Sequence, residues 1–213
     1  SLPDMPIELQ PLIPFLIFTA VFSALTSVAY MAAIRKGREL ATRSQWSMPK
    51  LLLSCVVVVG AIGVVVPDVA GLGLRQINQM LDAQFGLGML LVLLAGKIFV
   101  TAYCLNTGFF GGVFGPALFV GAATGAVVAH VAILLGLAPH LSYALPVAAI
   151  AAVGGAVIGA PLTAIMIVIE LTGSYAYGLS AMLCAILCSL LTLRFFGLSY
   201  FDRQLLDRGV DLR

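Results

Sequence analysis

The chain has 213 residues, of which 62% are hydrophobic and 9% are charged, and its mean hydropathy is +1.12. Soluble domains carry about 25% charged residues, so this composition excludes a soluble globular domain and predicts an integral membrane protein. The net charge of +2 is too small to indicate a nucleic-acid partner, and no basic patch is interleaved with aromatic residues. The start, Ser1-Leu2-Pro3-Asp4, shows no Met, no basic n-region and no A-x-A site, so we expect no signal peptide and a fragment or a processed chain.

The first part of the chain alternates long apolar runs with short polar segments. Residues 1–11 predict a loop. Apolar runs of about 20 residues predict membrane-spanning helices, and four of them follow, at residues 12–34, 48–66, 87–105 and 117–137. Between the first two lies a basic connection, in which Ser47 is expected to cap the second helix. Residues 74–83 are amphipathic and too short and polar to span.

The apolar segments of the second part are shorter and interrupted. After a loop at Pro139 and His140, an apolar segment is expected at 143–158, and Gly159-Ala160-Pro161 breaks it. A segment of about ten residues follows at 162–171, then a full span at 177–196 and a charged amphipathic tail helix at 198–213. Irregular backbone at membrane depth is tolerated only where protein or a water-filled path covers it. The pattern therefore favours a transport function over a simple membrane anchor.

Arginine and lysine gather in two segments, residues 35–50 and residues 194–213. Because basic loops are retained on the cytoplasmic side, we expect both segments, and with them the C-terminus, to be cytoplasmic.

One glycine-rich stretch lies between two of the long apolar runs. From Asn106 to Pro116 it reads N-T-G-F-F-G-G-V-F-G-P, and its glycines leave backbone N–H groups uncovered. Pro116 is expected to open the next helix, where its missing N–H costs nothing. A helix N-terminus carries partial positive charge and unpaired donors. At membrane depth this stretch therefore predicts an anion site.

Lys97 and Glu170 are the two charged residues between Ala83 and Leu193. A charge at the bilayer centre costs about 3 kcal/mol, so each needs a partner or a wet cavity. Lys97 either adds to the positive field of an anion path or reaches a carbonyl with its long stem, and the residues leave both interpretations open. Glu170 is either a proton carrier or bonded to backbone or hydroxyl groups near Gly173; its place at the end of a short helix favours the second.

The remaining reactive side chains predict no enzyme and no metal site. All four cysteines lie inside apolar runs, and Cys184 and Cys188, one helical turn apart, have no third ligand near them. His130 and His140 have no Ser, Asp or Cys partner at a spacing that would indicate a catalytic or metal site. We therefore expect no cofactor, and we interpret these residues as buried or structural.

The residues from Gly112 to Pro116 match the G-x-F-x-P pattern of the CLC family of chloride channels and chloride–proton antiporters, which the sequence resembles. Lys97 and Thr101 resemble the family's K-x-x-x-T, and residues 159–163 with Glu170-Leu171-Thr172 resemble its A-P-L-T…E-x-T segment. The tail from Ser199 to Gly209 is similar to the family's last intramembrane helix. In order, the resemblance runs from about Leu12 to Gly209.

The resemblance implies an all-α integral membrane protein, a CLC-type bundle of tilted, broken and re-entrant helices. The chain would be one transmembrane domain over residues 1–213, equivalent to the second of two inverted repeats. The protein would sit in the bilayer of a bacterial inner or plasma membrane, pair with its own N-terminal repeat, and form a homodimer through helices 162–171 and 177–196. It would carry chloride or a similar small anion as a channel or as a chloride–proton antiporter, a choice that this part of the sequence leaves open.

The resemblance also implies which residues hold the anion. The family uses backbone N–H groups of the x-F pair, here Val113 and Phe114 within Gly112, Val113, Phe114, Gly115 and Pro116. It adds a tyrosine hydroxyl from the final helix and a serine from the first repeat. Counting back from Arg208-Gly209 favours Phe201 at the tyrosine position, and a slip of one residue places Tyr200 there.

The family's G-S-G-I-P and G-[RK]-E-G-P motifs, which hold the serine and the gating glutamate, are absent from these 213 residues. They belong to the first repeat. A second hypothesis keeps the fold and makes the chain part of a transport-inactive membrane scaffold.

Overall fold

The computed structural model describes residues 9–109, 111–197 and 199–202, and within these ranges the ordered elements are helices, with no strand. In chain order they are α1 (Leu9–Arg43), α2 (Met48–Val65), the short 3-10 helix η1 (Pro67–Val69), α3 (Leu74–Leu81), α4 (Leu87–Asn106), α5 (Phe114–Leu134), α6 (Pro139–Ser142), α7 (Ala144–Ile158), α8 (Pro161–Thr172) and α9 (Tyr175–Phe196). The all-α fold class is confirmed. Of the expected tail helix 198–213, only residues 199–202 are described, and residues 200–202 are helical.

Helix α1 is longer than the apolar run predicted. The prediction ended the first helix at Ile34, whereas α1 continues through the basic segment to Arg43. Arginine, lysine, glutamate, leucine and alanine are all good helix formers, so the helix persists after the hydrophobicity ends. Arg35 and Glu39, one turn apart, lie 3.9 Å from each other on this extension.

Three other expectations about helix ends are corrected. Helix α5 begins at Phe114, so Pro116 lies inside its first turn, where a missing N–H also costs nothing. Pro139 and His140 do not lie in a loop but begin the short helix α6. Ser47 does stand at the N-cap position of α2, but its side chain makes no capping hydrogen bond.

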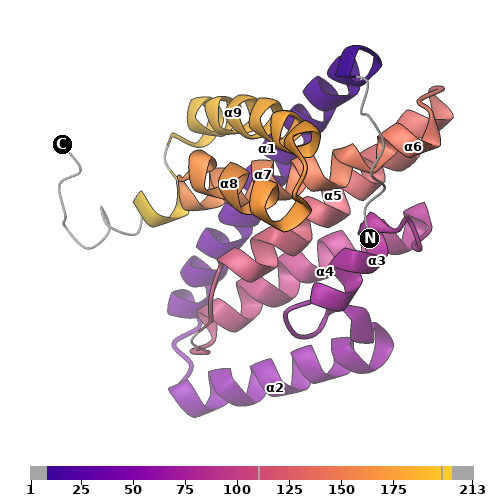
Figure 1. The fold of residues 1–213 in the computed structure, drawn as a ribbon. Helices are drawn as coiled ribbons and strands as arrows, with labels where there is room; N and C mark the ends of the chain where they lie inside the picture. The colour runs from indigo at the N-terminus through magenta and orange to yellow at the C-terminus, as the bar shows by residue number, and fades with distance from the viewer. Residues whose placement is uncertain (1–8, 110, 198, 203–213) are drawn as a thin grey trace.

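Helices α5 and α7 form the centre of the bundle, with α1, α4, α8 and α9 packed around them (Figure 1). Helix α2 lies at the edge, along the bottom of that view, with few neighbours. Six segments of the described chain are long and apolar enough to cross a membrane: 10–43, 48–65, 87–106, 114–134, 139–158 and 175–202. Helix α8 is apolar but shorter, in agreement with the expected half-span.

Two glycines one turn apart let α5 and α7 meet backbone to backbone. A Cβ added at Gly121 would lie 2.7 Å from the carbonyl oxygen of Ala149, and one at Gly125 would lie 2.7 Å from that of Leu145. Such small-xxx-small spacing permits close helix approach in membranes, where packing rather than hydrophobicity drives association. The central crossing is therefore fixed by Gly121 and Gly125.

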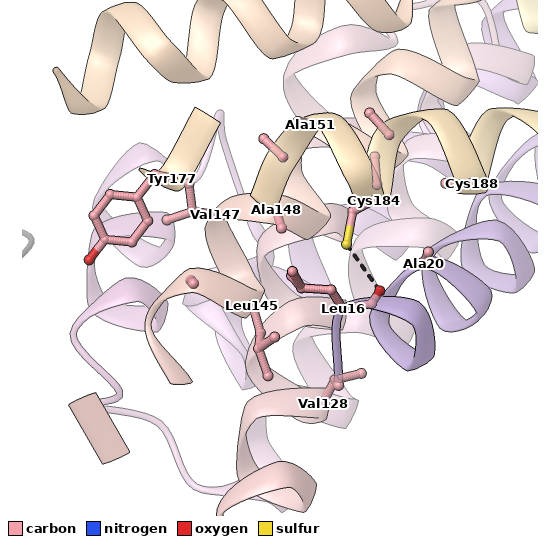
Figure 2. Packing of buried hydrophobic residues seen from close by; sticks show 14 of the residues in the cluster. Leu16, Ala20, Val128, Leu145, Val147, Ala148, Ala151, Tyr177, Cys184 and Cys188 are labelled. Carbon is pink, nitrogen blue, oxygen red and sulfur yellow. Dashed lines mark hydrogen bonds between the residues drawn. The ribbon is translucent and has the colours of Figure 1, made fainter. Parts of the chain in front are cut away.

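Small residues also line the contact between α1 and α9. Cys184 and Cys188 are both fully buried there, and the Cys184 thiol lies 3.1 Å from the carbonyl oxygen of Leu16, toward which its sulfur points in Figure 2. No group of three potential metal ligands occurs within the described ranges. The two cysteines pack as small apolar residues, as the sequence predicted.

Candidate anion site at the start of helix α5

The glycine-rich stretch connects α4 to α5, and its end forms the first turn of α5. Val113 is the N-cap, with φ −84° and ψ −25°, and its side chain is buried. Phe114, Gly115 and Pro116 are half-buried, while Gly112 is exposed. The first N–H groups of a helix have no partner within it. The arrangement thus places the Val113 and Phe114 amides at a helix end that, within the described ranges, has no capping side chain.

Tyr30 of α1 holds this helix start in position. Its hydroxyl donates to the carbonyl of Val113 over 3.0 Å, and the Tyr30 side chain is completely buried. The same carbonyl accepts the N–H of Ala117 at 3.1 Å, the first bond of the helix. Because the carbonyl accepts two hydrogen bonds, the orientation of the peptide between Val113 and Phe114, and with it the Phe114 N–H, is fixed. Sequence reasoning missed Tyr30; its signal was a lone phenol in an apolar run, whose hydroxyl must find a partner when buried.

Asn106 connects the other end of the glycine-rich stretch to α1 by a hydrogen bond. Its side-chain amide donates to the carbonyls of Ile34, at 2.8 Å, and of Ala102, at 2.6 Å. The approach is close because the facing residue of α1 is Gly37, where a Cβ would collide with the Asn106 amide. The two ends of the stretch are therefore both tied to α1.

The segment after α9 returns to this region. The Ser199 hydroxyl donates to the Asp202 carboxylate at 2.7 Å and accepts the Asp202 N–H at 3.2 Å, which caps the helical turn that starts at Tyr200. Ser199 lies against Gly159 at the end of α7, where a Cβ would lie 2.6 Å from the serine oxygen and φ is +81°. Only glycine fits this position.

Tyr200, not Phe201, packs on the hydrophobic cluster that contains Val113. Tyr200 is half-buried against a cluster that we call the Tyr30 cluster, whose buried members are Tyr30, Met31, Ile34, Ala102, Val113, Ala117, Val120, Val153 and Val157. Phe201 is 40% exposed and meets Tyr200 edge to face. The structure thus brings Tyr200 and Val113 into one cluster, whereas counting back along the sequence favoured Phe201.

Lys97 is buried in α4 and bonded to backbone carbonyls. Its ammonium group donates to Val69, at 3.0 Å, and to Gly71, at 2.6 Å, and lies 4.7 Å from the centroid of the Phe119 ring. Those carbonyls belong to η1 and the turn after it. The geometry corresponds to the second of the two interpretations, a long stem that reaches carbonyls.

Glu170 lies near the end of α8 with its side chain exposed. Among the described residues it has no hydrogen-bond or ion-pair partner, so the expected bond near Gly173 is not found there.

Three comparisons with known proteins agree with this architecture. A family model described as voltage gated chloride channel matches residues 2–193. An H(+)/Cl(−) exchange transporter ClcA of Vibrio cholerae is 32% identical over 179 residues, 81% of this chain and 37% of the relative, and one of Vibrio vulnificus is 28% identical over 182 residues, 82% of this chain and 38% of the relative. The crystal structure of a slow cyanobacterial Cl−/H+ antiporter superposes with a TM-score of 0.83 at 20% identity, covering 98% of this chain and 49% of that one.

The chain spans less than half the length of each of these relatives. At 20% identity the structural match shows the shared fold alone, but the family match extends over most of the sequence. The chain therefore belongs to the voltage gated chloride channel family, the CLC family.

Proposed function

We propose that this chain forms one wall of a chloride pathway, and that the start of α5 holds the anion. The observation that carries the proposal is the uncapped N-terminus of α5 among apolar spans, with its Val113 peptide fixed by Tyr30. Val113 and Phe114 supply backbone N–H donors, within the segment from Gly112 to Pro116. Tyr200 supplies the hydroxyl, because it packs on the same cluster.

The chemistry of such a site is the replacement of water around chloride. Oriented N–H groups and the partial positive charge of a helix end stabilise an anion that has lost part of its hydration shell. The proposed donors are uncharged, so binding is strong enough for entry and weak enough for release, as conduction requires. We assign Lys97 to the scaffold, since its ammonium group is bonded to two carbonyls.

We further propose that transport is exchange of chloride against protons rather than channel conduction. The support is that the relatives above are named as H(+)/Cl(−) exchange transporters. The second wall of the pathway, with its serine and gating glutamate, would come from an N-terminal repeat. Counterflow of protons during chloride uptake by liposomes tests this point, and chloride flux without proton movement would contradict it.

The outer faces of α8 and α9 support a homodimer. They expose apolar side chains in the described chain, among them Leu162 (70% exposed), Met166 (63%) and Leu190 (60%). We propose that a second copy covers these faces within the bilayer. A monomer measured at low protein density in liposomes would contradict this.

The anion site is tested by removing one N–H without removing the helix. In the full-length protein, Val113→Pro deletes the donor, and proline is compatible with φ −84° at a helix start. The control, Val113→Ala, shortens the side chain and keeps the donor. A hydrogen bond to a charged group contributes about 1.5–3 kcal/mol, so chloride affinity should fall by roughly tenfold or more in Val113→Pro and little in Val113→Ala.

Chloride efflux from liposomes and calorimetric titration of chloride provide the two measurements. Equal flux and affinity in the two variants would contradict the site. Absence of chloride flux in the unmodified full-length protein would instead support the transport-inactive scaffold.

A further inference from the structure

An open groove of about 530 Å³ runs along α2. It is lined by Trp46, Lys50, Leu53, Ser54, Val57 and Val58. The five positions from 50 to 58 recur at helical spacing and share one side of α2, while Trp46 comes from the turn before it.

The groove has one cationic end and one apolar wall. Lys50 is exposed and, among the described residues, has no carboxylate partner. Leu53 and Val57, one and two turns further on, are 65% and 61% exposed. Ser54 already accepts a hydrogen bond from the Tyr103 hydroxyl at 3.2 Å, so the Lys50 ammonium group is the charged group available to a ligand, beside the indole N–H of Trp46.

The cationic end belongs to a wider positive region. Residues 35–50 contain five basic residues and one acidic residue, Glu39, which is 3.9 Å from Arg35. Arg43 and Lys50 are both exposed. The segment that leads into α2 and the groove is therefore strongly basic.

Two local hydrogen bonds from backbone N–H groups lie at the mouth of the groove. The N–H of Trp46 donates to the Ser44 hydroxyl at 3.4 Å, and the N–H of Lys50 donates to the Ser47 carbonyl at 2.9 Å. Of the residues of α2 only Cys55 is fully buried, and Figure 1 shows the helix set apart from the central helices. The groove is thus a formed surface on a helix that faces outward.

We propose that this groove binds an anionic phospholipid of the bilayer, with its phosphate on Lys50 and an acyl chain along Leu53 and Val57. Tryptophan is enriched at the membrane interface, and a lysine near an anionic membrane surface contributes about 1 kcal/mol of attraction. Trp46 would lie at the level of the lipid headgroup, Lys50 would bind the phosphate, and Leu53 and Val57 would contact the acyl chain of one lipid. The site is independent of the proposed chloride transport.

Trp46, the one tryptophan of this sequence, provides the probe. The full-length protein is placed in phosphatidylcholine liposomes that contain either dibrominated phosphatidylglycerol or dibrominated phosphatidylcholine, which quench nearby tryptophan emission. The Trp46 signal is the difference between the protein and its Trp46→Phe variant. The expected result is half-quenching at about fivefold less of the anionic lipid, the effect of one lysine at the surface.

Three charge variants decide the outcome. Lys50→Gln should abolish the preference for the anionic lipid, Lys50→Arg should keep it, and Lys36→Gln, an exposed lysine outside the groove, should keep most of it. Equal quenching by the two lipids would overturn the proposal. So would an equal loss in Lys36→Gln and Lys50→Gln, or no quenching by either lipid, which would mean that protein covers the groove.

Discussion

Tyr200 and Phe201 are neighbours in the chain with different surroundings. Tyr200 packs on the Tyr30 cluster, which also contains Val113, whereas Phe201 is 40% exposed. A one-residue difference on a helix turns a side chain by about 100°, so only one of the two can face the start of α5. The structure therefore favours Tyr200 as the hydroxyl donor of the proposed site.

Replacing Tyr200 by phenylalanine tests this assignment with a single atom. Tyr200→Phe should keep the ring on the Tyr30 cluster and weaken chloride binding by roughly tenfold, because a hydrogen bond to a charged group is lost. Calorimetric titration of chloride into the full-length protein measures it. Phe201→Leu is the matched control, and an affinity loss there but not in Tyr200→Phe would restore the choice that the sequence spacing favoured.

The sequence predicted the candidate donors but not what orients them. The glycines and Pro116 marked the start of α5 because their backbone chemistry is local. Tyr30 and Val113 are 83 positions apart in the chain, and nothing in the local sequence pattern connects the two. The same holds for Lys97, whose carbonyl partners depend on where η1 packs.

At the scale of elements, the bundle depends on how closely α5 and α7 approach. Gly125 faces the backbone of Leu145 and Pro146, whereas a Cβ added at Gly60 in α2 would meet no packed neighbour within 4 Å. A change from glycine to alanine therefore meets packed backbone at Gly125 and open space at Gly60.

Gly125→Ala should destabilise the protein by about 1–3 kcal/mol, the usual cost of inserting atoms into a packed contact. Gly60→Ala should be neutral or stabilise by up to about 1 kcal/mol, since alanine is the better helix former. Thermal unfolding in detergent measures both changes. A Gly125→Ala protein as stable as Gly60→Ala would show that the central crossing is looser than described.

Helix positions were predictable from hydrophobic runs, and helix ends were less so. The apolar runs located the long helices because a bilayer demands about 20 apolar residues. The end of α1 was predicted nine residues early, at Ile34 instead of Arg43. Hydropathy indicates which residues can lie in the bilayer, but it does not indicate where the helical backbone ends. The short helix α6 was missed because proline and histidine were interpreted as a break, although proline suits a first helical turn.

At the scale of the whole molecule, the proposed site would be enclosed only in the complete protein, because this chain spans less than half the length of its relatives. It covers 37% of the Vibrio cholerae relative and 49% of the cyanobacterial antiporter chain. The uncapped amides at Val113 and Phe114 need a facing wall to exclude water, because an anion is stabilised more strongly by dipoles in a dry site than in bulk water. The central claim is therefore best tested in the complete protein.

Bromide substitutes for chloride and gives an anomalous X-ray signal. Crystals of the full-length protein grown in bromide should show an anomalous peak within hydrogen-bonding reach of the Val113 and Phe114 amides and of the Tyr200 hydroxyl. The peak should disappear in the Val113→Pro variant and persist in Val113→Ala. Bromide peaks found elsewhere in the membrane region, with none at the start of α5, would contradict the account.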